Sequence, residues 1–133
     1  MKNYPMAKEW LKASYYDLEV IKEILDNKHL THMSAFHAQQ ALEKTLKAVL
    51  ELHNQEIPKI HNVKKLLKLT KEYIRFSVDI ETIVKIDTLY IESRYPGDMG
   101  LLPYGQPTVQ DAEKFYQVAC DLFNEVSGIV DEG

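Results

Sequence analysis

Residues 36–48 read Phe36-His37-Ala38-Gln39-Gln40-Ala41-Leu42-Glu43-Lys44-Thr45-Leu46-Lys47-Ala48, and this stretch decides the fold. Small and apolar side chains recur in and around it at three- and four-residue steps, the period of one helix face: Ala35, Ala38, Leu42, Leu46 and Val49. Polar side chains recur in the same way on a neighbouring face: His37, Gln40, Lys44 and Lys47. The pattern predicts an amphipathic helix with an unusually polar second face.

That polar face can be given two interpretations. An imidazole, an amide and two amines can all donate hydrogen bonds to an anion or to a base edge, so these four residues are candidate ligand-binding residues. The alternative is an ordinary solvated face with intrahelical ion pairs such as Glu43 with Lys47. Spacing alone favours the second interpretation.

The rest of the chain is also helical in pattern. Five helices are predicted, at roughly 5–26, 31–53, 61–75, 78–93 and 108–130. Thr31 and Ser77 are the expected N-caps of the second and fourth, and Thr108 with Asp111 resembles a capping box at the fifth. No alternating strand pattern is present, and the connections before residue 94 are short. The sequence therefore predicts one domain over 1–133, an all-α, antiparallel up-and-down bundle of about five helices.

Composition restricts the class of protein. Hydrophobic residues make up 45% of the chain, which excludes a disordered tail, and the formal net charge of -4 argues against a general nucleic-acid coat. Cys120 is the single cysteine, so no internal disulfide is possible, and a lone thiol fits a reducing cytoplasm. No apolar signal core and no apolar run long enough for a membrane span is present. We expect a cytoplasmic protein with no membrane segment.

The segment 94–106 breaks the helical pattern. It holds three of the five glycines and, with Pro107, three of the five prolines, yet it also carries several apolar side chains. Such loops either contribute to a site or interface or pack as an apolar lid over one end of a bundle. Arg94 opens this loop and could grip a phosphate with two parallel hydrogen bonds, or could satisfy the last carbonyls of the preceding helix. The candidate loop residues are Tyr95, Asp98 and Tyr104.

Familiar catalytic and metal-binding patterns are missing from the sequence. Di-metal bundles use Glu-x-x-His pairs, and no Glu here has His three positions later. A Gly-rich phosphate loop and a Gly-x-Ser-x-Gly elbow are also missing. We therefore predict neither a metal site nor a cofactor.

Three fragments in fixed order resemble the HEPN (higher eukaryotes and prokaryotes nucleotide-binding) domain family. They are His37-Ala-Gln-Gln-Ala-Leu-Glu-Lys44-x-Leu-Lys47-Ala, then His61-Asn62-Val63, then Arg94-Tyr95-Pro96. The resemblance covers essentially the whole chain. It implies that the second and fourth helices face each other, with Arg94 near the polar face of the second.

The chain departs from the nuclease members of that family. Their motif is an arginine, a polar residue, three to five further residues and a histidine, whereas here no histidine follows His61. The chain is thus similar to the branch with Arg-Tyr-Pro. The resemblance implies a non-catalytic nucleotide-binding or regulatory protein, working with a minimal nucleotidyltransferase partner in a toxin–antitoxin-like pair. Two alternatives stay open: a metal-independent ribonuclease toxin that recruits His37 or His61, acting on RNA, and a module used only for protein–protein assembly.

A homodimer is also predicted. The helix expected at about 78–93 is apolar over most of its circumference, through Ile80, Ile83, Val84, Ile86, Leu89, Tyr90 and Ile91. One side of each helix in a small bundle normally meets water, so part of this surface is expected to meet a second chain together with Leu101, Leu102 and Tyr104. The alternative is that the loop covers this helix within one chain.

Overall fold

The computed structural model describes residues 1–92 and 106–131, with the backbone alone at 90–92. This part of the chain contains helices and no strand. The helices are α1 (Tyr4–Ile24), α2 (Thr31–Leu52), α3 (Val63–Thr70), α4 (Ile80–Glu92) and α5 (Val109–Asp131). The predicted all-α bundle of about five helices is therefore confirmed.

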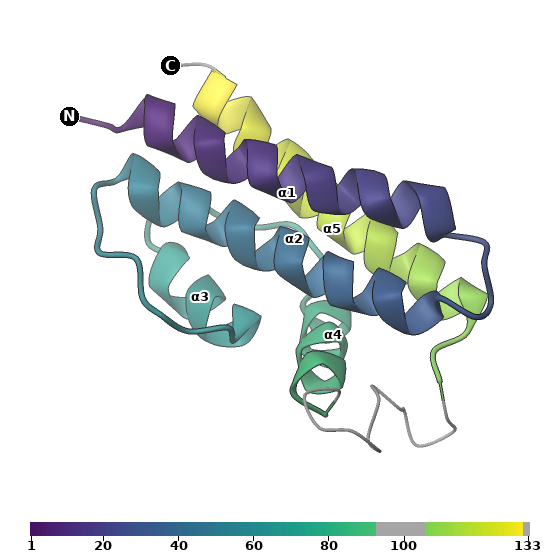
Figure 1. Ribbon diagram of the computed structural model, residues 1–133. Coiled ribbons are helices and arrows are strands. Elements are labelled where there is room, and N and C mark those ends of the chain that lie inside the picture. The colour runs from purple at the N-terminus through teal and green to yellow at the C-terminus, as the bar shows by residue number, and fades with distance from the viewer. Residues whose placement is uncertain (93–105, 132–133) are drawn as a thin grey trace.

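Helix α2 lies at the centre of the bundle and contacts every other helix. The long helices α1, α2 and α5 lie alongside one another, while the shorter α3 and α4 pack against α2 away from α1 (Figure 1). Small residues let α1 and α2 approach closely, and the Ser14 hydroxyl donates to the Ala41 carbonyl at 2.9 Å. Because α2 is surrounded, its polar face is packed between neighbours and is not an ordinary solvated surface.

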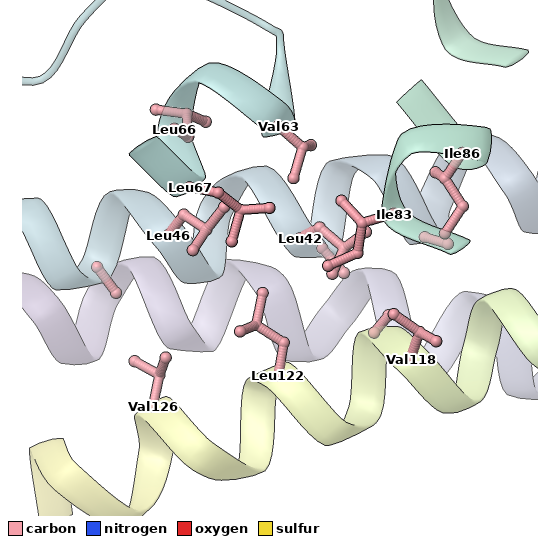
Figure 2. Packing of buried hydrophobic residues seen from close by; sticks show 14 of the residues in the cluster. Leu42, Leu46, Val63, Leu66, Leu67, Ile83, Ile86, Val118, Leu122 and Val126 are labelled. Atoms are coloured by element: carbon pink, nitrogen blue, oxygen red, sulfur yellow. The ribbon is translucent and has the colours of Figure 1, made fainter. Parts of the chain in front are cut away.

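The core takes side chains from all five helices, and Figure 2 shows part of it. Leu42 and Leu46 of α2 point towards Leu122 of α5, and α3 and α4 close the other side through Val63 and Ile83. These five side chains are fully buried. Burying such side chains stabilises the fold by roughly 1.5–3 kcal/mol each, so the apolar stripe of α2 holds the other helices together.

Two of the three predicted helix caps are wrong. Thr31 is the first residue of α2, and the preceding Leu30 makes no side-chain cap. Ser77 donates instead to Glu125 of α5, and Asp79 caps α4 by accepting from the Thr82 amide at 3.3 Å. The third prediction is confirmed.

The confirmed cap is the box at the start of α5. The Thr108 amide donates to Asp111 at 2.9 Å, and the Asp111 amide donates to the Thr108 hydroxyl at 3.0 Å. Aspartate can therefore replace the usual glutamate at this position of the box.

Helix α3 is shorter than the sequence predicts. It begins after Asn62, whose side chain accepts from the Lys65 amide at 3.0 Å, and it ends at Thr70. The Thr70 hydroxyl bonds back to the carbonyls of Leu66 and Leu67. No glycine or proline marks this end, so the periodic pattern through Arg75 predicted too long a helix.

None of the helices in the described ranges is long and apolar enough to cross a membrane.

Helix α4 buries much of its apolar surface within its own chain. Ile83, Ile86 and Leu89 are at most 2% exposed, whereas Ile80 is 46% exposed. These three side chains therefore lie in the core of their own chain, and the prediction of a second chain on α4 concerns the remaining surface. The side chains of Tyr90 and Ile91, like Leu101, Leu102 and Tyr104, lie outside the described residues.

Candidate functional site

The first polar cluster of α2 is built around Asp17 of α1. The Asp17 carboxylate accepts from His37 Nδ1 at 2.9 Å through one oxygen and from Lys44 Nζ at 2.7 Å through the other. The Asp17 side chain is only 10% exposed, whereas those of His37 and Lys44 are 20% and 28% exposed. A buried carboxylate therefore holds an imidazole and an amine at the edge of solvent.

A second cluster repeats this chemistry further along α2. Glu43 Oε1 accepts from Lys47 Nζ at 2.8 Å and from His61 Nδ1 at 2.7 Å. The Glu43 and Lys47 side chains are 4% and 9% exposed, and that of His61, just before α3, is 63% exposed. The second carboxylate oxygen of Glu43 is buried and finds no hydrogen-bond partner in the part of the chain that the structure describes.

Amide side chains join this second cluster to the start of α3. Gln39 Nε2 donates to the His61 carbonyl at 2.8 Å, and Gln40 Nε2 donates to Gln39 Oε1 at 2.7 Å. Asp87 of α4 accepts from the amides of Val63 and Lys64, the first two residues of α3. The polar side of α2 thereby positions α3 and α4 as well as presenting polar groups to solvent.

The pKa of Asp87 reflects its buried position. Burial raises the pKa of this carboxyl, while hydrogen bonds from the Lys64 and Val63 amides and from Gln39 lower it, and the nearby charge of Glu43 raises it. Two carboxyl groups thus lie close together beneath the start of α3. Lys47 is the cation that offsets the charge of Glu43, and its Nζ also lies 5.7 Å from the centroid of the Trp10 ring.

The clusters share one charge balance. Each contains a carboxylate, a lysine and a histidine, so in each the carboxylate offsets the charge of the lysine, and the carboxyl group of Asp87 lies near the second cluster as well. The lysines do not offer unbalanced positive charge to an anion. Any phosphate bound here must be matched by protonated histidine or by a cation from elsewhere in the chain.

The predicted site residues fall into these two clusters. His37 and Lys44 meet at Asp17, while Gln40 and Lys47 belong to the network around Glu43 and Gln39. The intrahelical pair of Glu43 with Lys47, named as the alternative interpretation, is present. The remaining predictions concern Arg94, Tyr95, Asp98 and Tyr104, which lie outside the described residues.

The sequence prediction named Glu43 but missed two other acids, Asp17 of the first cluster and Asp87 beside the second. Asp17 lies beside the apolar stripe of α1, next to Leu18, and a carboxyl at that position is a signal for a buried partner. Asp87 follows the same logic, since it lies between Ile86 and Leu89 on α4. As whole residues, Asp17 and Asp87 are 8% and 5% exposed.

Other reactive groups give no second site. Among the described residues, no group of three or more His, Cys, Asp or Glu side chains could hold a metal ion. Burial raises the pKa of the Cys120 thiol above its ordinary value. A protonated, half-buried thiol is a poor nucleophile, which agrees with a packing role for Cys120.

Comparisons with known proteins agree with the fold. The model of the HEPN domain matches residues 7–129. This chain belongs to the HEPN family. Among solved structures, the HEPN protein described here is similar to the crystal structure of TT1696 from Thermus thermophilus, with a TM-score of 0.68 and 25% sequence identity. The match covers 92% of this chain and 96% of that one. No curated protein matches it.

Proposed function

We propose that this HEPN protein is a non-catalytic, nucleotide-binding regulatory protein, of the branch with Arg-Tyr-Pro at residues 94–96, and that it works in the cytoplasm. The observation that carries the proposal is the cluster of His37 and Lys44 on Asp17. Its amine and imidazole reach the solvent edge and are both fixed by a buried carboxylate. Groups held in this way bind a ligand without a large cost of ordering side chains.

The charge balance of the cluster supports a proposal about the charge of the ligand. Lys44 and His37 would donate hydrogen bonds to a phosphate dianion. The positive charge of Lys44 is already offset by Asp17, which also pairs with His37. Binding therefore needs positive charge beyond that of Lys44, which Asp17 already offsets. Arg94, near this face according to the resemblance, is the second expected source of charge.

Nucleotide binding is tested by thermal shift with ATP, GTP, CTP and UTP. A ligand that binds the folded protein raises its melting temperature by mass action. The effect should be lost in Lys44→Met and retained in Lys12→Met, an exposed lysine of α1 without a described ion pair. If no nucleotide shifts the melting temperature of the wild-type protein at millimolar concentration, the proposal is wrong.

Arg94→Ala is the second test. We expect this variant to bind nucleotide at least about tenfold more weakly while its melting temperature without ligand changes little, because a charge-assisted hydrogen bond is worth roughly 1.5–3 kcal/mol. Normal nucleotide affinity combined with a much lower melting temperature would make Arg94 a structural residue.

The partner that we propose is a minimal nucleotidyltransferase, in a toxin–antitoxin-like pair. Membership of the HEPN family supports this proposal, and the two proteins should co-purify when their genes are expressed together. The product of a nucleotidyltransferase gene adjacent to this one is the partner to test. If the adjacent gene product does not bind at micromolar concentration, the nucleotidyltransferase proposal is wrong. The alternative is then a module that assembles with some other protein.

A ribonuclease is the second candidate function, and one observation favours it. Each of His37 and His61 has its Nδ1 held by a carboxylate, at 2.9 Å and 2.7 Å, which is how a catalytic imidazole is oriented. The missing histidine after Arg94 argues against it. We therefore expect no cleavage of single-stranded RNA by the purified protein. Cleavage that persists in chelator and disappears in His37→Ala or His61→Ala would reverse this expectation.

A further inference from the structure

A groove on the outer side of α3 combines positive charge with an apolar floor. Its volume is about 410 Å³, and it is formed by α3, by the link to α4 and by the first residue of α4. Cations line its rim and apolar side chains its floor: Lys64, Lys68, Lys71 and Arg75 on the rim, and Leu67, Ile74, Phe76 and Ile80 on the floor. We name it the cationic groove.

The rim of the cationic groove follows one narrow stripe. Lys64, Lys68 and Lys71 stand at helical spacings of four and three residues, and all three are exposed. Like charges at this spacing repel each other, so the stripe lowers the stability of an isolated α3. None of the four rim cations forms an ion pair with an acid of the described ranges. Their charge is therefore available to something outside the chain.

The stripe stands out against the charge of the whole molecule. Residues 59–75 carry six cations and one acid, Glu72, although the formal net charge of the chain is -4. Glu72 does not line the groove. This concentration of positive charge, separate from the clusters on α2, indicates a partner with negative charge.

The floor identifies the class of partner. Three of the four floor side chains are aliphatic, and Ile80 is 46% exposed. Single-stranded nucleic acids need aromatic rings on which their bases stack, and Phe76 is the single ring here. Aliphatic side chains instead suit the apolar face of a peptide helix, whose flanking carboxylates would meet the lysines.

We propose that the cationic groove binds an acidic amphipathic segment of a partner protein. The rim from Lys64 to Lys71 spans seven residues, about 10 Å along a helix, so acids at positions i, i+4 and i+7 of the segment can face the three lysines. Leucine or isoleucine side chains between those acids would fill the floor. This proposal does not depend on nucleotide binding at α2, because the two sets of residues are separate.

Fluorescence anisotropy with a labelled peptide panel tests the proposal. The peptides, about 14 residues long, carry leucines in one helical stripe flanked by glutamates; one control has the same composition scrambled, and another has lysines for glutamates. We expect the acidic amphipathic peptides alone to bind. Lys68→Glu should weaken binding at least about tenfold, the loss expected for one charge-assisted contact turned repulsive.

The matched control is Lys65→Glu, which makes the same charge change on the same helix outside the groove. It should weaken binding less than about twofold, an effect of long-range charge alone. Ile80→Ser tests the floor and should also weaken binding, since this exposed side chain can change without disturbing the core. Equal effects of the two lysine variants, or no preference over the scrambled peptide, would overturn the proposal. So would tight binding of an oligouridine that depends on Lys68.

Discussion

Single residues show where sequence reasoning succeeded at the site and where it stopped. The polar face of α2 could be predicted because helical spacing is local. The pair of Glu43 with Lys47 could be predicted for the same reason. Asp17 could not, because it is twenty residues from His37 and belongs to another helix. The charge of Lys44 was visible in the sequence, but its neutralisation by Asp17 depended on tertiary packing.

The buried pair of Glu43 and Lys47 yields a prediction about stability. Lys47→Met removes the amine that offsets a nearly buried carboxylate, and we expect a loss of about 3 kcal/mol, at the low end for such pairs because His61 remains as a partner of Glu43. Urea unfolding measures the change. The double variant Glu43→Gln with Lys47→Met should cost less than the sum of the two single variants.

The control for this double-mutant cycle is Lys12→Met, which removes an exposed lysine of α1. It should change the free energy of unfolding by less than about 0.5 kcal/mol. Additive costs of the two single variants would mean that Glu43 and Lys47 do not stabilise each other, despite the 2.8 Å between their charged atoms.

At the scale of elements, α3 depends on a carboxylate from α4. Asp87→Ala leaves the amides of Val63 and Lys64 without their acceptor, and we expect a loss of about 1–2 kcal/mol, the cost of losing a helix cap. Thr88→Ala, at the exposed neighbouring position, is the control. Hydrogen exchange should show faster opening of α3 than of α2 in Asp87→Ala. Equal protection of α3 in the variant and the wild-type protein would contradict this role.

The stability that Asp79 gives to the start of α4 should depend on pH in the acid range. Hydrogen bonds from the Thr82 side chain and backbone lower the pKa of Asp79 below its ordinary value of 3.8. A carboxyl with a lowered pKa in the folded state contributes stability that is present above its unfolded pKa and is lost as the pH falls through the folded value. The difference in melting temperature between wild type and Asp79→Ala should therefore shrink as the pH falls below 3.8. A difference that stays constant between neutral and acid pH would contradict this.

The fold of the whole molecule was largely predictable, since long amphipathic helices with short links have few ways to pack. The ends of the helices were less predictable, because contacts with other helices decide where the last helical turn stops. Helix α3 ends at Thr70 without any glycine or proline, and Ser77 is drawn from its expected capping role to Glu125 of α5. The cationic groove extends from α3 into this same poorly predicted region, the link to the start of α4.

Association into a homodimer is the remaining prediction at this scale, and the described surface offers a second candidate interface besides α4. Helix α4 uses Ile83, Ile86 and Leu89 in its own core, so it offers less apolar surface than the sequence indicated. A larger exposed set lies on α1, where Tyr15, Tyr16 and Val20 are 47%, 57% and 41% exposed.

These exposed side chains adjoin α5, and the ring centroids of Tyr15 and Phe123 lie 6.3 Å apart. Aromatic surface of this kind is common at protein interfaces. We therefore expect a homodimer in which α1 and α5 of one protomer meet the same helices of the other, because a two-fold interface uses one patch twice. Light scattering on the wild-type protein at micromolar concentration should give twice the mass of one chain. Tyr16→Glu should give a monomer, while Leu69→Glu, which changes an apolar side chain of α3 that is 45% exposed, should leave the dimer intact. A monomeric wild-type protein would exclude the dimer, and a dimer insensitive to Tyr16→Glu would exclude this patch as the interface.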